Sequence, residues 1–259
     1  MQYLKNKFKS AKFAPLLFVM CAMVFSDSLA QTFRPLLSAE KKAIGKARKL
    51  VKEKSSFHVL MLTTEGEMVL KLYNETPLHR DNLITKIKAG FFDSLLFHRV
   101  INNFVVQGGD PGSKYATAET KLGDGEAPGP MIPAEFRTEQ GIYHKRGALG
   151  MARDNNPEKA SSNAQFYIVQ RKAYRPAQLD SFVVQRKLQL NEEQRKLYTT
   201  VGGTPHLDGG YTVFGELVSG WETLDKLAAT PTDKTDRPLN PMRMRVFLVH
   251  EPKVKKQKK

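Results

Sequence analysis

The chain has little of what most enzymes use for covalent or metal chemistry. Its 259 residues include one cysteine, Cys21, and one tryptophan. The six histidines (58, 79, 98, 144, 206 and 250) have no metal-ligand spacing, and the sequence contains no G-x-S-x-G elbow and no glycine-rich phosphate loop. An H-R-D triplet at 79–81 has Lys86 where a kinase catalytic loop needs asparagine. We therefore expect no metal, no cofactor and no nucleophile, which excludes the common hydrolytic and nucleotide chemistries.

The first thirty residues have the composition of a secretory leader. Several lysines precede an apolar run of about twelve residues, APLLFVMCAMVF, and the small residues Ser28 and Ala30 precede Gln31. The run is short for a membrane span. We expect residues 1–30 to be a signal peptide cleaved after Ala30 and the protein to be exported to the periplasm, with a retained anchor as the alternative. Cleavage removes Cys21, so no disulfide framework can form.

Positive charge is in excess and lies mostly at the ends. The net charge is +15, and lysines concentrate in residues 39–54 and 253–259. Aromatic residues do not alternate with these lysines, as a surface that stacks bases requires, so we expect no nucleic-acid partner. Residues 31–56 are expected to be a basic helical segment and residues 252–259 a basic tail. Both are interpreted as solvated ends, with weak attraction to anionic envelope surfaces as a further use.

The middle of the chain has the pattern of a mainly β protein. Short apolar runs predict a strand pair that turns at Glu65 and Gly66, followed by strands at 96–101, 104–108, 147–152, 164–170, 211–218 and 243–250. Two lone helices are predicted. One has Thr76 as N-cap, and the other begins with a capping box of Ser219 and Glu222. Together these features indicate a closed antiparallel barrel capped by two helices.

Residues 175–203 do not fit the barrel pattern. They predict two helices, the second of which is capped by Asn191 and Gln194 and stopped by Gly202. We interpret this segment as a helical hairpin inserted between two barrel strands.

The stretch FHRVINNFVVQGGD, residues 97–110, places one arginine among apolar residues. Burying an unpaired guanidinium is costly. Arg99 therefore either reaches a sheet edge and pairs with a carboxylate, or faces an apolar cleft and takes part in chemistry. A hairpin turning at residues 102–103 would bring Gln107 close to opposite Arg99, where its amide can hold the guanidinium without neutralising it. Phe104 and Val105 would wall the same patch.

This stretch resembles the central signature of the cyclophilin-type peptidyl-prolyl cis-trans isomerases. The resemblance continues through IPAEF (132–136), GALGMAR (147–153), AQFYIV (164–169) and HLDGGYTVFGELVSG (206–220). It implies an eight-stranded cyclophilin-like barrel over residues 57–251 and a rotamase acting on X-Pro bonds in exported proteins. The implied partners are proline-containing unfolded or extended polypeptides, and we expect a monomer. The alternative is a periplasmic chaperone or peptide-binding module with little turnover.

The resemblance also implies roles for individual residues. Arg99 matches the catalytic arginine, and the matched substrate-binding positions are Phe104, Val105, Gln107, Ala152, Arg153, Gln165, Tyr167, His206, Leu207 and Tyr211. The family more often has methionine, asparagine and phenylalanine where this chain has Val105, Arg153 and Tyr167, which leaves substrate preference open. Because the insertion joins segments that contain matched residues at both its ends, we expect it to lie beside the cleft.

Overall fold

The computed structural model describes residues 36–252. The predicted signal peptide, its cleavage after Ala30 and nearly all of the predicted basic tail lie outside these residues. Within the described part of the chain, no helix combines the length and the apolar character needed to cross a membrane.

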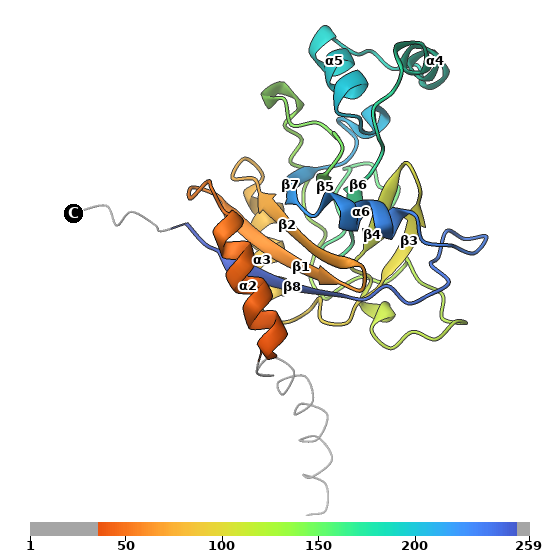
Figure 1. Ribbon diagram of the computed structural model, residues 1–259. Coiled ribbons are helices and arrows are strands. Elements are labelled where there is room, and N and C mark those ends of the chain that lie inside the picture. Colours follow the sequence, from red (N-terminus) through yellow and green to blue (C-terminus); the bar gives the residue numbers. More distant parts are fainter. Residues whose placement is uncertain (1–35, 253–259) are drawn as a thin grey trace, which may run out of the picture. The chain divides into compact units, whose positions relative to one another are not determined.

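Eight strands form one antiparallel sheet that curves as a half-barrel (Figure 1). The strands are β1 (Phe57–Thr63), β2 (Gly66–Leu72), β3 (Phe97–Ile101), β4 (Val105–Gly108), β5 (Ala148–Met151), β6 (Phe166–Val169), β7 (Val213–Ser219) and β8 (Met244–His250). Their order in the sheet is β3-β4-β6-β5-β7-β2-β1-β8. The two end strands approach each other just before they begin, through an isolated bridge between Leu96 and Arg243. The mainly β prediction and its strand positions are confirmed, with ends shifted by two residues at most.

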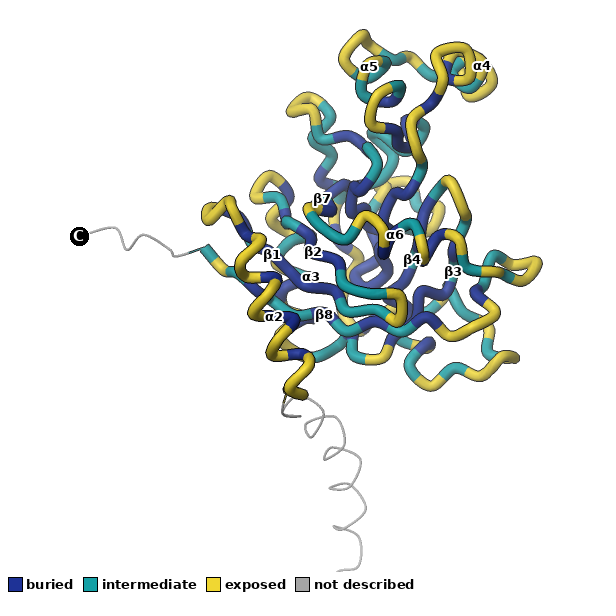
Figure 2. Tube along the Cα trace, viewed as in Figure 1, coloured by how far each residue is buried: buried dark blue, intermediate teal, exposed yellow. Residues whose placement is uncertain are grey.

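Two helices bury their apolar faces in the concave side of the sheet. They are α3 (Pro77–Lys88) and α6 (Trp221–Ala228). Leu83 and Ile87 of α3 and Leu224 and Leu227 of α6 belong to the main core cluster, which also holds the buried aromatic residues Phe92, Phe97, Phe166 and Phe214. Figure 2 shows this buried interior beneath exposed turns. Burial of apolar surface of this kind is the dominant stabilising contribution to the fold.

The starts of α3 and α6 differ from the predicted caps. Thr76 is the N-cap of α3, but its side chain makes no capping bond, and the Glu135 carboxylate instead accepts from the N–H groups of Leu78 (3.2 Å) and His79 (3.0 Å). The predicted box of Ser219 and Glu222 is wrong. Strand β7 continues through Ser219, and α6 starts after Gly220, whose φ of +97° few other residues adopt.

Helix α2 (Ser38–Leu50) packs on the outer face of the sheet. Ala43, Ile44 and Ala47 are buried against residues of β1 and β8. Leu50, the last residue of the helix, is 43% exposed. The Glu40 carboxylate contacts the guanidinium of Arg245 on β8, which adds a charged contact to the apolar one.

The segment 175–203 contains helices α4 (Pro176–Arg186) and α5 (Glu192–Thr200). Helix α5 begins at the predicted capping box, in which Asn191 accepts from the Gln194 N–H at 2.8 Å. Leu179 of α4 and Tyr198 of α5 meet in a small apolar cluster with Tyr143 and Tyr174. The two helices lie beyond the ends of β5 and β6 (Figure 1).

Candidate active site

The two faces of the sheet carry different apolar clusters. Side chains alternate along a strand, so Val106 and Ile168 point into the core while their neighbours Val105 and Tyr167 point outward. The outward residues form a second cluster, together with Phe104, Ala152, Leu207 and Tyr211. The predicted site residues therefore gather on the outer face of β3, β4, β5 and β6.

Arg99 reaches this outer face because β3 is irregular. The register of β3 against β4 shifts between Phe97 and Arg99, which leaves His98 without a partner in the ladder. Such a bulge re-aims the side chains that follow it. Arg99 then pairs with Gln107, as predicted, and its Nη1 donates to Gln107 Oε1 at 3.3 Å.

A carboxylate also lies near Arg99. Asp236 Oδ2 is 3.6 Å from Arg99 Nε, and the two side chains are 44% and 40% exposed. Both partners that the sequence suggested, an amide and a carboxylate, are thus present. Because this ion pair is half open to water, it is weakly stabilising and leaves the guanidinium accessible to a ligand.

Gln107 is held by a second amide. Its Nε2 donates to Gln165 Oε1 at 3.3 Å, and Gln165 Nε2 donates to the carbonyls of Gly123 (2.9 Å) and Gly125 (2.7 Å). Gln165 is buried, and all its donors and acceptors named here point to protein groups. The row of Arg99, Gln107 and Gln165 is therefore anchored to the loop that contains Gly123 and Gly125.

Arg99 and Gln107 line a cavity of about 600 Å³. Nine of the eleven predicted site residues line it, namely Arg99, Phe104, Val105, Gln107, Ala152, Arg153, Tyr167, Leu207 and Tyr211. The other two support the walls. Gln165 lies behind Gln107, and the ring of His206 stacks on Phe104 with centroids 5.6 Å apart.

Two polar residues of the rim are fixed by neighbours. The Arg153 guanidinium lies 4.8 Å from the Tyr211 ring centroid and donates to the Gly210 carbonyl at 2.8 Å. His206 is packed between the rings of Phe104 and Phe182. Burial, aided by the nearby Arg186 cation, lowers the pKa of His206 to about 4, so its ring is neutral at pH 7.

Two loops complete the cavity, and the sequence analysis predicted no site residue in either of them. Residues 118 and 120–124 form one wall, and Asp233, Thr235 and Arg237 form another. Arg237 joins the loops by donating to the carbonyls of Thr117 (2.6 Å), Ala118 (3.1 Å) and Thr120 (2.6 Å). No periodic pattern or motif distinguishes these segments, since their position depends on contacts between residues more than a hundred positions apart.

A buried polar network lies behind the wall formed by Tyr167. The Tyr167 hydroxyl is 2.9 Å from His144 Nε2, and His144 Nδ1 is 2.9 Å from Asp208 Oδ1. The second carboxylate oxygen of Asp208 accepts from the Tyr198 hydroxyl at 2.5 Å. Tyr198 belongs to α5, so this network links the insertion to the cavity wall.

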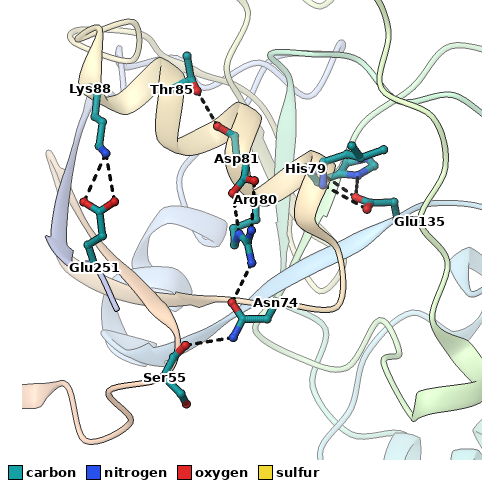
Figure 3. A network of polar contacts seen from close by, with 10 residues as sticks. Ser55, Asn74, His79, Arg80, Asp81, Thr85, Lys88, Glu135 and Glu251 are labelled. Carbon is teal, nitrogen blue, oxygen red and sulfur yellow. Dashed lines mark hydrogen bonds and ion pairs between the residues drawn. The ribbon is translucent and has the colours of Figure 1, made fainter. Parts of the chain in front are cut away.

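A second histidine network has the residue types of a hydrolase triad but no access to a substrate. His79 Nε2 lies 3.0 Å from Ser161 Oγ. His79 Nδ1 lies 2.7 Å from Glu135 Oε2, a contact that Figure 3 shows. Ser161 and His79 are fully buried, and neither lines the cavity described above. Burial lowers the pKa of His79, and the three residues serve to fix the start of α3.

Metal ligands do not cluster in the described part of the chain. Across residues 36–252, no group of three or more histidine, cysteine, aspartate or glutamate side chains is placed to hold a metal ion. The cavity offers three arginines (Arg99, Arg153 and Arg237), the Gln107 amide and an apolar wall, which suit the binding of an extended peptide.

Known proteins are similar to this chain in sequence and in fold. A family model described as cyclophilin type peptidyl-prolyl cis-trans isomerase/CLD matches residues 58–248. A provisionally named peptidyl-prolyl cis-trans isomerase of Staphylococcus haemolyticus is 35% identical over 183 residues, which cover 70% of this chain and 85% of that protein. Another, from Staphylococcus aureus, is 34% identical over 189 residues, which cover 73% and 89%.

Solved structures agree with the fold. The crystal structure of a Cryptosporidium parvum cyclophilin type peptidyl-prolyl cis-trans isomerase superposes with a TM-score of 0.56 and 24% identity, covering 76% of this chain and 99% of that chain. The same protein in the presence of the dipeptide Ala-Pro gives a TM-score of 0.55 and 23% identity, covering 74% and 98%. This chain therefore belongs to the cyclophilin-type peptidyl-prolyl cis-trans isomerase family. The predicted family and enzyme class are confirmed.

Proposed function

We propose that the cavity grips a proline ring of a substrate while Arg99 lowers the barrier to rotation about the preceding peptide bond. Planarity of that bond comes from delocalisation of the nitrogen lone pair, with a barrier of ~18–20 kcal/mol. In the twisted transition state the lone pair returns to the proline nitrogen, which can then accept a hydrogen bond. A guanidinium aimed at this nitrogen stabilises the twisted state more than either planar isomer, which is the condition for catalysis.

The observation that carries this proposal is the way Arg99 is held. Gln107 accepts from one guanidinium nitrogen at 3.3 Å, while the side chain stays 40% exposed and faces the cavity. The arginine is thus oriented and still has N–H groups to offer. Phe104, Val105, Tyr167 and Leu207 supply the apolar wall for a proline ring.

The remaining roles follow from the same arrangement. Ala152 and Arg153 hold the substrate backbone, Gln165 acts from behind the wall by fixing Gln107, and His206 and Tyr211 form the rim. Support for proline-containing peptides as partners comes from the Cryptosporidium relative, which was crystallised in the presence of Ala-Pro. The chemistry needs no cofactor, since hydrogen bonding and orientation supply the stabilisation.

NMR exchange spectroscopy on a short Ala-Pro peptide tests this function. Catalytic amounts of the protein should speed cis-trans exchange well beyond the uncatalysed time of tens to hundreds of seconds. Binding of the peptide with no increase in the exchange rate would favour the chaperone alternative.

The proposal extends to where the protein acts and how it is organised. We infer that residues 1–30 direct export, that the mature chain starts at Gln31, and that it assists folding in the periplasm as a monomer with weak attraction to anionic envelope surfaces. The domain spans 57–251 as a closed barrel with a helical hairpin at 175–203. The bridge between Leu96 and Arg243 supports closure. Mass spectrometry of protein from the cell envelope tests export, since an uncleaved chain in the membrane fraction contradicts it.

A further inference from the structure

A second groove lies next to the catalytic cavity, on the inserted helix α4. It has a volume of about 810 Å³, and α4 contributes to it through Gln178, Ser181, Phe182 and Gln185. The opposite side is formed by Arg171, Tyr174 and Arg175, in the segment that leads from β6 into α4. The groove is therefore made almost wholly by the segment that distinguishes this chain from the family pattern.

Three contacts join the groove to the cavity. The Phe182 ring meets His206 with centroids 5.3 Å apart, and His206 stacks on Phe104 of the cavity wall at 5.6 Å. In addition, the Arg171 N–H donates to the Phe104 carbonyl at 3.3 Å. These two ring steps correspond to roughly three residues of extended chain. A peptide with its proline in the cavity can thus reach the groove over a continuous row of rings.

The groove is positively charged. Arg171 and Arg175 line it, and the Arg186 guanidinium lies 5.7 Å from the Phe182 ring centroid. Arg171 interacts with uncharged groups, lying 3.8 Å from the Tyr174 ring centroid and donating to the Asn103 carbonyl at 3.4 Å. Within residues 36–252, none of these three guanidiniums has a carboxylate within ion-pair distance, and no acidic residue lines the groove.

Resting on the proposed isomerase function, we propose that this groove is a second substrate subsite that binds acidic residues about three positions from the proline. Arginine binds carboxylates through paired, charge-assisted hydrogen bonds, and within residues 36–252 none of these arginines is paired with a carboxylate. The groove gives the enzyme a preference for prolines flanked on one side by aspartate or glutamate. A tetrapeptide is too short to display it.

Peptide binding measured by fluorescence anisotropy tests the subsite without requiring turnover. The probes are labelled Ala-Pro peptides with two glutamates three and four residues after the proline, or three and four residues before it, each paired with its glutamine version. One of the two glutamate peptides should bind about fivefold more tightly than its glutamine version, in keeping with solvent-accessible ion pairs. The ratio of the two affinities, glutamate peptide over glutamine peptide, should fall as the salt concentration is raised.

Variants of the groove arginines test whether the groove causes the preference for the glutamate peptide. The double variant Arg171→Gln/Arg175→Gln should reduce the ratio to below about twofold. Arg175→Gln alone changes an exposed residue and should shift it in the same direction without loss of folding. The control Lys196→Gln removes the same charge from an exposed position on α5, outside the groove, and should leave the ratio unchanged.

Three outcomes overturn the subsite. The first is equal binding of the glutamate and glutamine peptides. The second is a fall in the affinity ratio in Lys196→Gln as large as that in the arginine double variant. The third is arginine-dependent binding to phosphatidylglycerol vesicles without any peptide preference. The last would make the groove a lipid headgroup site. Isomerisation of an uncharged tetrapeptide is measured separately, so a failure of the catalytic function is distinguished from a failure of the subsite.

Discussion

The hydroxyl of Tyr167 lies 2.9 Å from His144 Nε2, and this contact connects the wall of the cavity to the inserted helix α5. Asp208 continues the connection by accepting from Tyr198 with its second carboxylate oxygen. Gly150 makes the arrangement possible, because a Cβ atom at that position would overlap the Tyr167 ring. Where the family more often has phenylalanine, this chain has a hydroxyl with a buried partner.

Replacing Tyr167 by phenylalanine should lower stability more than activity. The ring remains to contact proline, but His144 loses the group bonded to its buried nitrogen. Leaving a buried polar group unpaired costs about 1–3 kcal/mol of unfolding free energy. Urea unfolding measures this loss, and kcat/KM on a tetrapeptide should stay within about threefold of wild type. If Tyr167→Phe has the same unfolding free energy as wild type, the hydrogen bond between Tyr167 and His144 contributes nothing to stability.

The two neighbours of Arg99 should differ in their importance. Gln107 is hydrogen-bonded to the guanidinium and to Gln165, whereas Asp236 lies 3.6 Å away and is 44% exposed. Gln107→Ala should therefore lower kcat/KM by about tenfold, the equivalent of ~1.4 kcal/mol. The matched variant Asp236→Asn, which removes an exposed charge, should change it by less than about threefold. The reverse order of effects would mean that the ion pair orients the arginine.

Acid should destabilise the protein through His98, which is buried, and His206, which is partly buried. Burial lowers the pKa of both His98 and His206 from 6.5 to about 4. Between these values the unfolded chain binds protons that the folded protein does not, so the free energy of unfolding falls as the pH drops from about 6.5 to about 4. Above about pH 6.5 both histidines are neutral in the folded and the unfolded chain, so this loss of unfolding free energy is absent.

The variant His206→Phe tests whether protonation of His206 causes part of this acid destabilisation. Phenylalanine retains a ring beside Phe104 but removes one titrating group. The dependence of unfolding free energy on pH in this interval should become shallower by up to about 1.4 kcal/mol per pH unit. Denaturant titrations at several pH values provide the measurement, and parallel pH profiles for variant and wild type would contradict the role of His206.

Local patterns were sufficient for most of the fold and for the centre of the site. Alternation and turn residues predicted the strands, and the hairpin between β3 and β4 brought Gln107 opposite Arg99. The capping error at Ser219 has a local cause, since the strand continues through Ser219 and the N-cap position falls on Gly220, which has no side chain to cap with.

Parts of the site that depend on distant contacts could not be predicted. Arg237 is fixed by carbonyls near residue 118, and Asp236 reaches Arg99 because its own carbonyl accepts from the Val100 N–H at 2.8 Å. Asp208 meets His144 across 64 positions of sequence. None of these pairs has a periodic or spacing signal, so only the assembled structure identifies them.

The central claim is that the Arg99 guanidinium stabilises the twisted peptide bond, and replacing it tests this most directly. The measurement is the rate of cis-trans exchange of an Ala-Pro peptide, by NMR, with wild type, Arg99→Ala and the charge-preserving Arg99→Lys. Because the side chain is 40% exposed, both variants should fold with nearly unchanged Tm. We expect Arg99→Ala to lose about a hundredfold to a thousandfold in kcat/KM, with little recovery in Arg99→Lys. A folded Arg99→Ala protein with wild-type exchange catalysis would contradict it.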